Sequence, residues 1–101
     1  MNQGSQRISV FQLPELIGKI KLIDIREPYE YERGFVPTAV NIPANTLLRD
    51  VESYMNLEEE YHIICQSGGR SGQASSILAE MGYKVVDVAG GTGNYPGPLH
   101  R

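Results

Sequence analysis

Short apolar runs alternate with segments of helical spacing along this sequence. Runs rich in β-branched and other apolar residues predict five strands, over Arg7–Val10, Lys21–Ile25, Val40–Pro43, Tyr61–Cys65 and Lys84–Val88. Apolar residues three and four apart, or Pro and Gly at the boundaries, predict helices over Gln12–Gly18, Pro28–Arg33, Asn45–Leu57 and Ser71–Met81, with a short helical turn after Gly90. Strands separated by helices form βαβ crossovers. The pattern therefore predicts an α/β fold, with a mostly parallel five-stranded sheet and helices on both faces.

Length, composition and charge narrow the class of protein. At 101 residues the chain has room for one domain, which we take to span residues 1–101. A hydrophobic fraction of 41% and a charged fraction of 21% are typical of globular proteins and exclude a disordered chain. A net charge of −3 without a Lys/Arg cluster argues against a nucleic-acid partner. No apolar run approaches the about 20 residues that a membrane-spanning helix needs, so no membrane association is expected.

Cysteine usage points to a reducing compartment. Cys65 is the single cysteine, so no disulfide can form within the chain and a structural zinc site lacks its usual ligands. The segment Met1–Arg7 contains no apolar stretch of the kind found in signal peptides. We therefore expect a cytoplasmic protein without a bound metal.

The junction after the fourth predicted strand carries a strong nucleophile. Cys65 ends a buried strand, a glycine-rich turn follows, and Arg70 and Ser71 enter a helix. The glycines allow successive N–H groups to point into one hollow, and the helix N-terminus adds about half a positive charge there. With the guanidinium of Arg70, these groups should stabilise a thiolate or an anion held against it. A buried structural cysteine before an ordinary turn is the alternative interpretation.

Three segments resemble the single-domain rhodanese-like sulfurtransferase family. Cys65–Ser71 (CQSGGRS) is similar to the family's active-site loop, Leu22–Tyr31 to its strand and acidic helix, and Gly34–Pro43 to its glycine–proline–asparagine–proline signature. With Gly90, Gly91 and Tyr95 included, the resemblance covers about residues 8–95, which we take as the core of the domain. The sequence departs from the family pattern at Phe35, Thr38 and Tyr95, where the family often has histidine, glycine and tryptophan.

The resemblance implies an activity and a set of site residues. Cys65 would take a sulfane sulfur from a donor such as thiosulfate, become a persulfide, and pass the sulfur to a thiol or cyanide-like acceptor without a cofactor. Asp24 and Arg26 would form an ion pair at the rim of the pocket. The resemblance implies a small-molecule sulfur donor and acceptor, with a protein donor or acceptor as the alternative, and we expect a monomer. The residues that would bind the substrate are Gln66, Ser67, Gly68, Gly69, Arg70 and Ser71.

Two other functions stay open beside sulfur transfer. Phosphatases and arsenate reductases also use Cys and Arg around an anion, but their loops have five residues between the two, whereas four separate Cys65 from Arg70 here. A binding module with a vestigial cysteine would have no need of the adjacent glycines.

The two histidines are not expected to take part in the chemistry. His62 lies three residues before Cys65 and should face the opposite side of the sheet, which argues against its acting as a catalytic base. His100 is expected to lie in a disordered tail.

Overall fold

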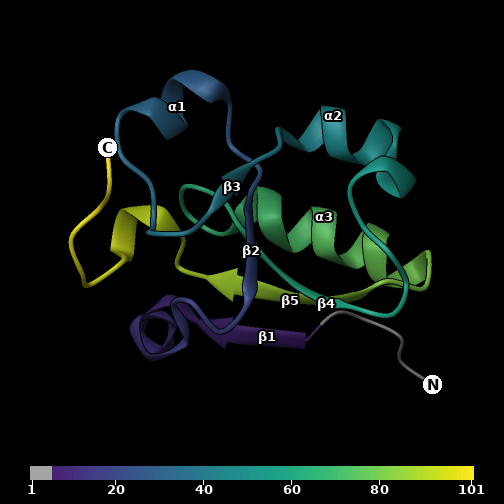
Figure 1. Ribbon diagram of the computed structural model, residues 1–101, viewed down its shortest axis with the longest axis horizontal. Helices are drawn as coiled ribbons and strands as arrows, with labels where there is room; N and C mark the ends of the chain where they lie inside the picture. Colours follow the sequence, from purple (N-terminus) through teal and green to yellow (C-terminus); the bar gives the residue numbers. More distant parts are fainter. Residues whose placement is uncertain (1–5) are drawn as a thin grey trace.

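A five-stranded parallel sheet forms the centre of the molecule (Figure 1). The computed structural model describes residues 6–101, and its strands lie in the order β1-β5-β4-β2-β3. The strands are β1 (Gln6–Ser9), β2 (Lys21–Asp24), β3 (Val40–Asn41), β4 (Glu60–Ile64) and β5 (Lys84–Ala89). Every neighbouring pair is parallel, so the predicted α/β fold is confirmed, with a sheet that is wholly rather than mostly parallel.

Helical segments cover both faces of this sheet, as predicted. They are the α-helices α1 (Pro28–Glu32), α2 (Ala44–Arg49) and α3 (Gly69–Glu80), and the 3₁₀ helices η1 (Val10–Leu16), η2 (Val51–Ser53) and η3 (Thr92–Asn94). Residues of α2, η2 and α3 pack into the core on one face, and residues of η1 pack on the other (Figure 1). Strand β4 supplies both cores, Ile63 to the first and Ile64 to the second. A strand covered on both faces carries apolar residues on both sides, which explains why Ile63 and Ile64 stand next to each other in β4.

The first predicted helix is a 3₁₀ helix that begins earlier than expected. The spacing predicted an α-helix over Gln12–Gly18, whereas η1 covers Val10–Leu16. Ser9 caps it: its Oγ accepts from the N–H of Phe11 at 3.1 Å. Pro14 has no N–H to donate to Val10, four residues earlier, which disfavours an α-helix at this point. Val10 and Leu13 are both fully buried, and their spacing of three matches the period of a 3₁₀ helix.

The predicted continuous helix over Asn45–Leu57 is wrong, because the chain breaks at Asp50. Asp50 has φ −151° and ψ 60°, outside the helical region, and it separates α2 from η2. Its carboxylate accepts a hydrogen bond of 2.6 Å from the Ser53 hydroxyl, a turn interaction that competes with the helix. The break still buries Leu47 and Val51 in the same core.

The C-terminal segment folds back onto the chain beyond α1, so the expected disorder at His100 is wrong. His100 and Phe35 exchange two backbone hydrogen bonds of 2.8 and 2.9 Å in an antiparallel bridge. Their rings also meet edge to face, with centroids 5.2 Å apart. Figure 1 shows the C-terminus beside α1. Across residues 6–101, the helices are too short or too polar to span a bilayer.

Candidate active site

Cys65 follows the last residue of β4, at the edge of the sheet where α3 begins. Its side chain is 1% exposed, and its Sγ accepts hydrogen bonds from the backbone N–H groups of Gly68 at 3.1 Å and Ser71 at 3.2 Å. The second of these groups belongs to the first turn of α3, a helix of 12 residues. Amide donors and the positive end of a helix both favour a negative charge on the sulfur. The sequence argument for a stabilised thiolate therefore has a geometric basis.

The turn after Cys65 depends on one of its two glycines. Gly68 has φ 108°, in the region that disfavours side chains, and a Cβ there would lie 3.2 Å from the backbone nitrogen of Gly90. Gly69 begins α3, and a Cβ there would meet no atom within 4 Å. Gly68 thus lets the chain reverse tightly enough to direct its own amide at the sulfur.

A buried carboxylate holds the loop to β5. The Ser71 hydroxyl donates to Oδ1 of Asp87 at 2.6 Å, and the carbonyl oxygen of Gly68 lies 3.1 Å from the same hydroxyl. The other carboxylate oxygen accepts from Nε of Arg7 at 3.2 Å. Asp87 is 1% exposed, so these polar partners are what make its burial tolerable. The N-terminus of α3 is therefore tied to the sheet by a polar contact as well as by apolar packing.

The segment after β5 fixes the main chain of the nucleophile. The N–H of Thr92 donates to the carbonyl of Cys65 at 2.8 Å, and the N–H of Gly93 donates to the carbonyl of Gln66 at 2.9 Å. Gly91 lies so close that an added Cβ would overlap both carbonyl groups. Its φ of 69° and ψ of −177° lie in a region that glycine alone adopts readily. The glycine pair after β5 thus permits close approach of two backbones.

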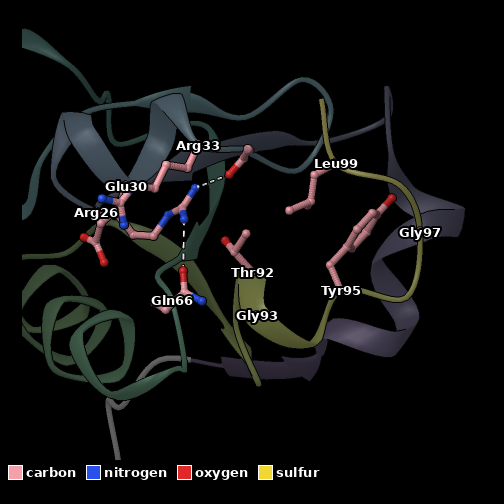
Figure 2. A pocket seen from close by; sticks show the side chains of 10 residues that line it. Arg26, Glu30, Arg33, Gln66, Thr92, Gly93, Tyr95, Gly97 and Leu99 are labelled. Atoms are coloured by element: carbon pink, nitrogen blue, oxygen red, sulfur yellow. Dashed lines mark hydrogen bonds between the residues drawn. The ribbon is translucent and has the colours of Figure 1, made fainter. Parts of the chain in front are cut away.

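Asp24 and Arg26 form the ion pair that the family resemblance implied, and it is buried. Arg26 Nη2 lies 2.9 Å from Oδ2 of Asp24, and the side chains are 3% and 0% exposed. The same guanidinium donates to the carbonyl of Gly34 at 2.8 Å. It also donates to Oε1 of Gln66 at 3.0 Å, the contact drawn between the two labelled side chains in Figure 2. Asn41 completes the arrangement by donating to the carbonyls of Asp24 and Arg26, each at 2.9 Å. Arg26 therefore connects the Cys65 loop to the segment after α1.

Arg70 does not point at the sulfur but pairs with Glu30 of α1. Its Nη1 and Nη2 lie 3.0 and 3.1 Å from the two oxygens of the Glu30 carboxylate, in a two-pronged contact. The hydrogen bond to Arg70 lowers the pKa of Glu30, and the hydrogen bond from Glu30 raises the pKa of Arg70, to which the charge of Cys65 contributes further. The sequence predicted that Arg70 would help to stabilise a thiolate or an anion held against it, whereas in this structure its guanidinium pairs with a protein carboxylate.

Two cavities flank this ion pair. The larger, of about 480 Å³, lies between α1, the start of the Cys65 loop and the C-terminal segment (Figure 2). Its lining includes Arg26, Glu30, Gln66, Thr92 and Tyr95. The smaller, of about 260 Å³, is lined by residues of α2 and α3 and of the segment before α1, among them Glu27, Asn45, Arg70, Gln73 and Ile77.

The structure brings most of the predicted site residues together around Cys65. The amides of Gly68 and Ser71 contact its sulfur, Gly69 lies between them at the start of α3, and Gln66 contacts Arg26 in the larger cavity. Ser67 is exposed at the tip of the loop. His62 is buried on the other face of β4, sharing that face with Ile64, and its Nδ1 has no hydrogen-bond partner among residues 6–101.

Sequence reasoning missed two residues of this site, Glu30 and Asp87. Asp87 had a visible signal, because a carboxylate within an apolar strand run needs a buried partner. Glu30 had none, since an acidic residue on a short acidic helix is ordinarily solvated. Its pairing with Arg70, 40 residues away, depends on how the fold places α1 near the N-terminus of α3.

Comparisons with known proteins agree with this geometry. The family model described as the rhodanese-like domain matches residues 10–95. The thiosulfate sulfurtransferase PspE of Escherichia coli (strain K12) is 36% identical over 83 residues, which cover 81% of this chain and 79% of PspE. The putative sulfurtransferase YtwF of Bacillus subtilis (strain 168) is 38% identical over 73 residues, 72% of this chain and 70% of YtwF. The crystal structure of SSP1007 from Staphylococcus saprophyticus superposes with a TM-score of 0.85 at 34% identity, covering 95% of this chain and 99% of that one.

Proposed function

The chain belongs to the rhodanese-like domain family, and from this premise we propose that it is a sulfurtransferase that carries sulfur as a persulfide on Cys65. One observation carries the proposal: the sulfur of Cys65 accepts two backbone hydrogen bonds at the N-terminus of α3. A thiolate held in this way is a nucleophile that needs no histidine base. The relatives named as sulfurtransferases, PspE and YtwF, support the same activity.

The loop offers further amides to the sulfur that would be added. The N–H groups of Gln66 and Ser67 have no backbone acceptor among residues 6–101, and those of Gly69 and Arg70 begin α3, where a helix leaves its amides free. A persulfide carries its negative charge one atom beyond Sγ. These amides would stabilise that charge as the Gly68 and Ser71 amides stabilise the thiolate.

The proposed reaction has two displacement steps. The Cys65 thiolate attacks the outer sulfur of thiosulfate, a sulfur–sulfur bond forms to Sγ, and the bond to the sulfonate breaks so that sulfite leaves with the electron pair. A cyanide ion or a thiolate then attacks the terminal sulfur of the persulfide. The bond to Sγ breaks, and its electron pair returns to Cys65 as thiolate. Sulfur changes partners in both steps, so no external oxidant or reductant is required.

The phosphatase reading has less support. Four residues separate Cys65 from Arg70, one fewer than in the loops of phosphatases and arsenate reductases. The ring of backbone amides is therefore one donor short for a tetrahedral phosphate. A small aryl phosphate should therefore be hydrolysed negligibly.

Intact-mass measurement tests the proposed function. Incubation with thiosulfate should add the mass of one sulfur atom to the wild-type protein, and later addition of cyanide should remove it. Cys65→Ser is the matched control, because serine is nearly isosteric and should preserve the fold while abolishing the mass gain. A wild-type protein that gains no sulfur, or a Cys65→Ser variant that gains it equally, would sink the proposal.

A further inference from the structure

The contact between Arg70 and Glu30 occupies the groups that an anionic donor would use. A guanidinium offers two parallel N–H donors to a planar carboxylate, and the same pair suits two oxygens of a sulfonate. Glu30 takes both, at 3.0 and 3.1 Å. In this arrangement the positive charge of Arg70 is already neutralised, so a donor anion and Glu30 compete for one site.

The ion pair also stands between the two cavities. Glu30 of α1 lines the larger cavity and Arg70 of α3 lines the smaller one. The ion pair between their side chains lies between the two cavities. Figure 2 shows the Glu30 side chain beside Arg26 at the end of the larger cavity. Separation of the two side chains would remove this barrier and leave the Arg70 guanidinium free to meet a ligand.

Release of Glu30 requires little of the rest of the fold. The Glu30 side chain is 20% exposed and the Arg70 side chain is 43% exposed. None of the residues of α1 is buried in the core. Oε1 of Glu30 also accepts from the N–H of Glu27 at 3.0 Å, so the carboxylate keeps a partner on its own helix when Arg70 leaves. An exposed ion pair is weak, so a bound anion can displace it.

We propose that Glu30 is a specificity-determining residue that occupies the Arg70 fork and must be displaced by the anionic group of the sulfur donor. This proposal rests on the proposed sulfurtransferase function. Its consequence is that small inorganic donors such as thiosulfate bind more weakly than the loop alone would allow. Donors that make additional contacts in the flanking cavities gain an advantage over them.

Two variants of the same helix test this role. Glu30→Gln keeps the shape of the side chain and its acceptor for Glu27 but removes the charge that holds Arg70. Glu32→Gln removes the same charge from an exposed position of α1 and serves as the control. The KM for thiosulfate should fall about two- to five-fold in Glu30→Gln and stay at the wild-type value in Glu32→Gln. An unchanged or raised KM in Glu30→Gln would overturn the proposal, since Glu30 would then only orient Arg70.

A second readout does not depend on sulfur transfer. Iodoacetate carries a carboxylate and iodoacetamide is neutral, so the ratio of their alkylation rates at Cys65 reports whether Arg70 is free to attract an anion. Glu30→Gln should raise this ratio about two- to five-fold over wild type, and Glu32→Gln should leave it unchanged. Equal ratios in wild type and Glu30→Gln would refute the competition. If the protein forms no persulfide, the proposed function fails, yet the ratio still decides the role of Glu30.

Discussion

Single residues determine where the main chain of the nucleophile can lie. The clearest case is Gly91, whose backbone lies directly against the carbonyl groups of Cys65 and Gln66. Neighbouring amides use this close approach to donate to the same two carbonyls. The side chain missing from Gly91 is therefore a condition for the geometry of the Cys65 loop.

Replacement of Gly91 should show this condition in the free energy of unfolding. Gly91→Ala places a Cβ on two backbone carbonyls, which cannot move aside as a flexible side chain would, and adds strain at φ 69°. We expect a loss of about 2 kcal/mol or more in urea unfolding, with slower alkylation of Cys65. Gly18→Ala is the control, because φ is 86° there but no atom lies within 4 Å of the added Cβ. Equal losses in the two variants would show that backbone strain, not contact with the loop, determines the effect.

At the scale of elements, α3 is held to the sheet by both apolar and polar contacts. Ala74 and Leu78 pack into the core beneath it. At its N-terminus, Ser71 joins Asp87 of β5 at 2.6 Å. Since the Ser71 amide also donates to Sγ of Cys65, the same residue connects the strand, the helix and the sulfur.

Loss of the Ser71 hydroxyl should therefore weaken the fold at this junction. Ser71→Ala leaves a carboxylate oxygen of Asp87 buried with one donor fewer, and we expect a cost of about 1–3 kcal/mol in urea unfolding. Ser67→Ala removes a serine hydroxyl from an exposed position of the same loop and should leave the free energy of unfolding nearly unchanged. A Ser71→Ala variant as stable as Ser67→Ala would mean that Asp87 is satisfied by other groups.

At the scale of the whole molecule, we expect a buried histidine to make the stability depend on pH. His62 is 5% exposed within β4, its Nδ1 has no partner among residues 6–101, and burial lowers its pKa below the ordinary 6.5, opposed in part by the charge of Glu60. The folded protein therefore takes up this proton at a lower pH than the unfolded chain does. As pH falls below 6.5, the unfolded state binds more protons and the folded state loses stability; the loss stops below the folded pKa.

The variant His62→Leu should remove that part of the pH dependence. Between about pH 8 and about pH 5.5, the free energy of unfolding should fall further in wild type than in His62→Leu. Urea denaturation at both pH values measures the difference, and each protein at the higher pH serves as its own reference. If the two proteins lost the same stability over this interval, His62 would not contribute to the acid sensitivity.

The sequence by itself determined the strand and helix order, the parallel sheet and the Cys65 loop, because these depend on local spacing, on turn residues and on a motif within seven positions. The ion pair of Asp24 and Arg26 followed from the family resemblance, but its burial became visible only in the structure. Only the tertiary structure decided the pairing of Arg70 with Glu30, the contact of Ser71 with Asp87 and the return of His100 to Phe35. Each of these joins residues 16 to 65 positions apart, where packing of whole elements, not local preference, sets which side chains meet.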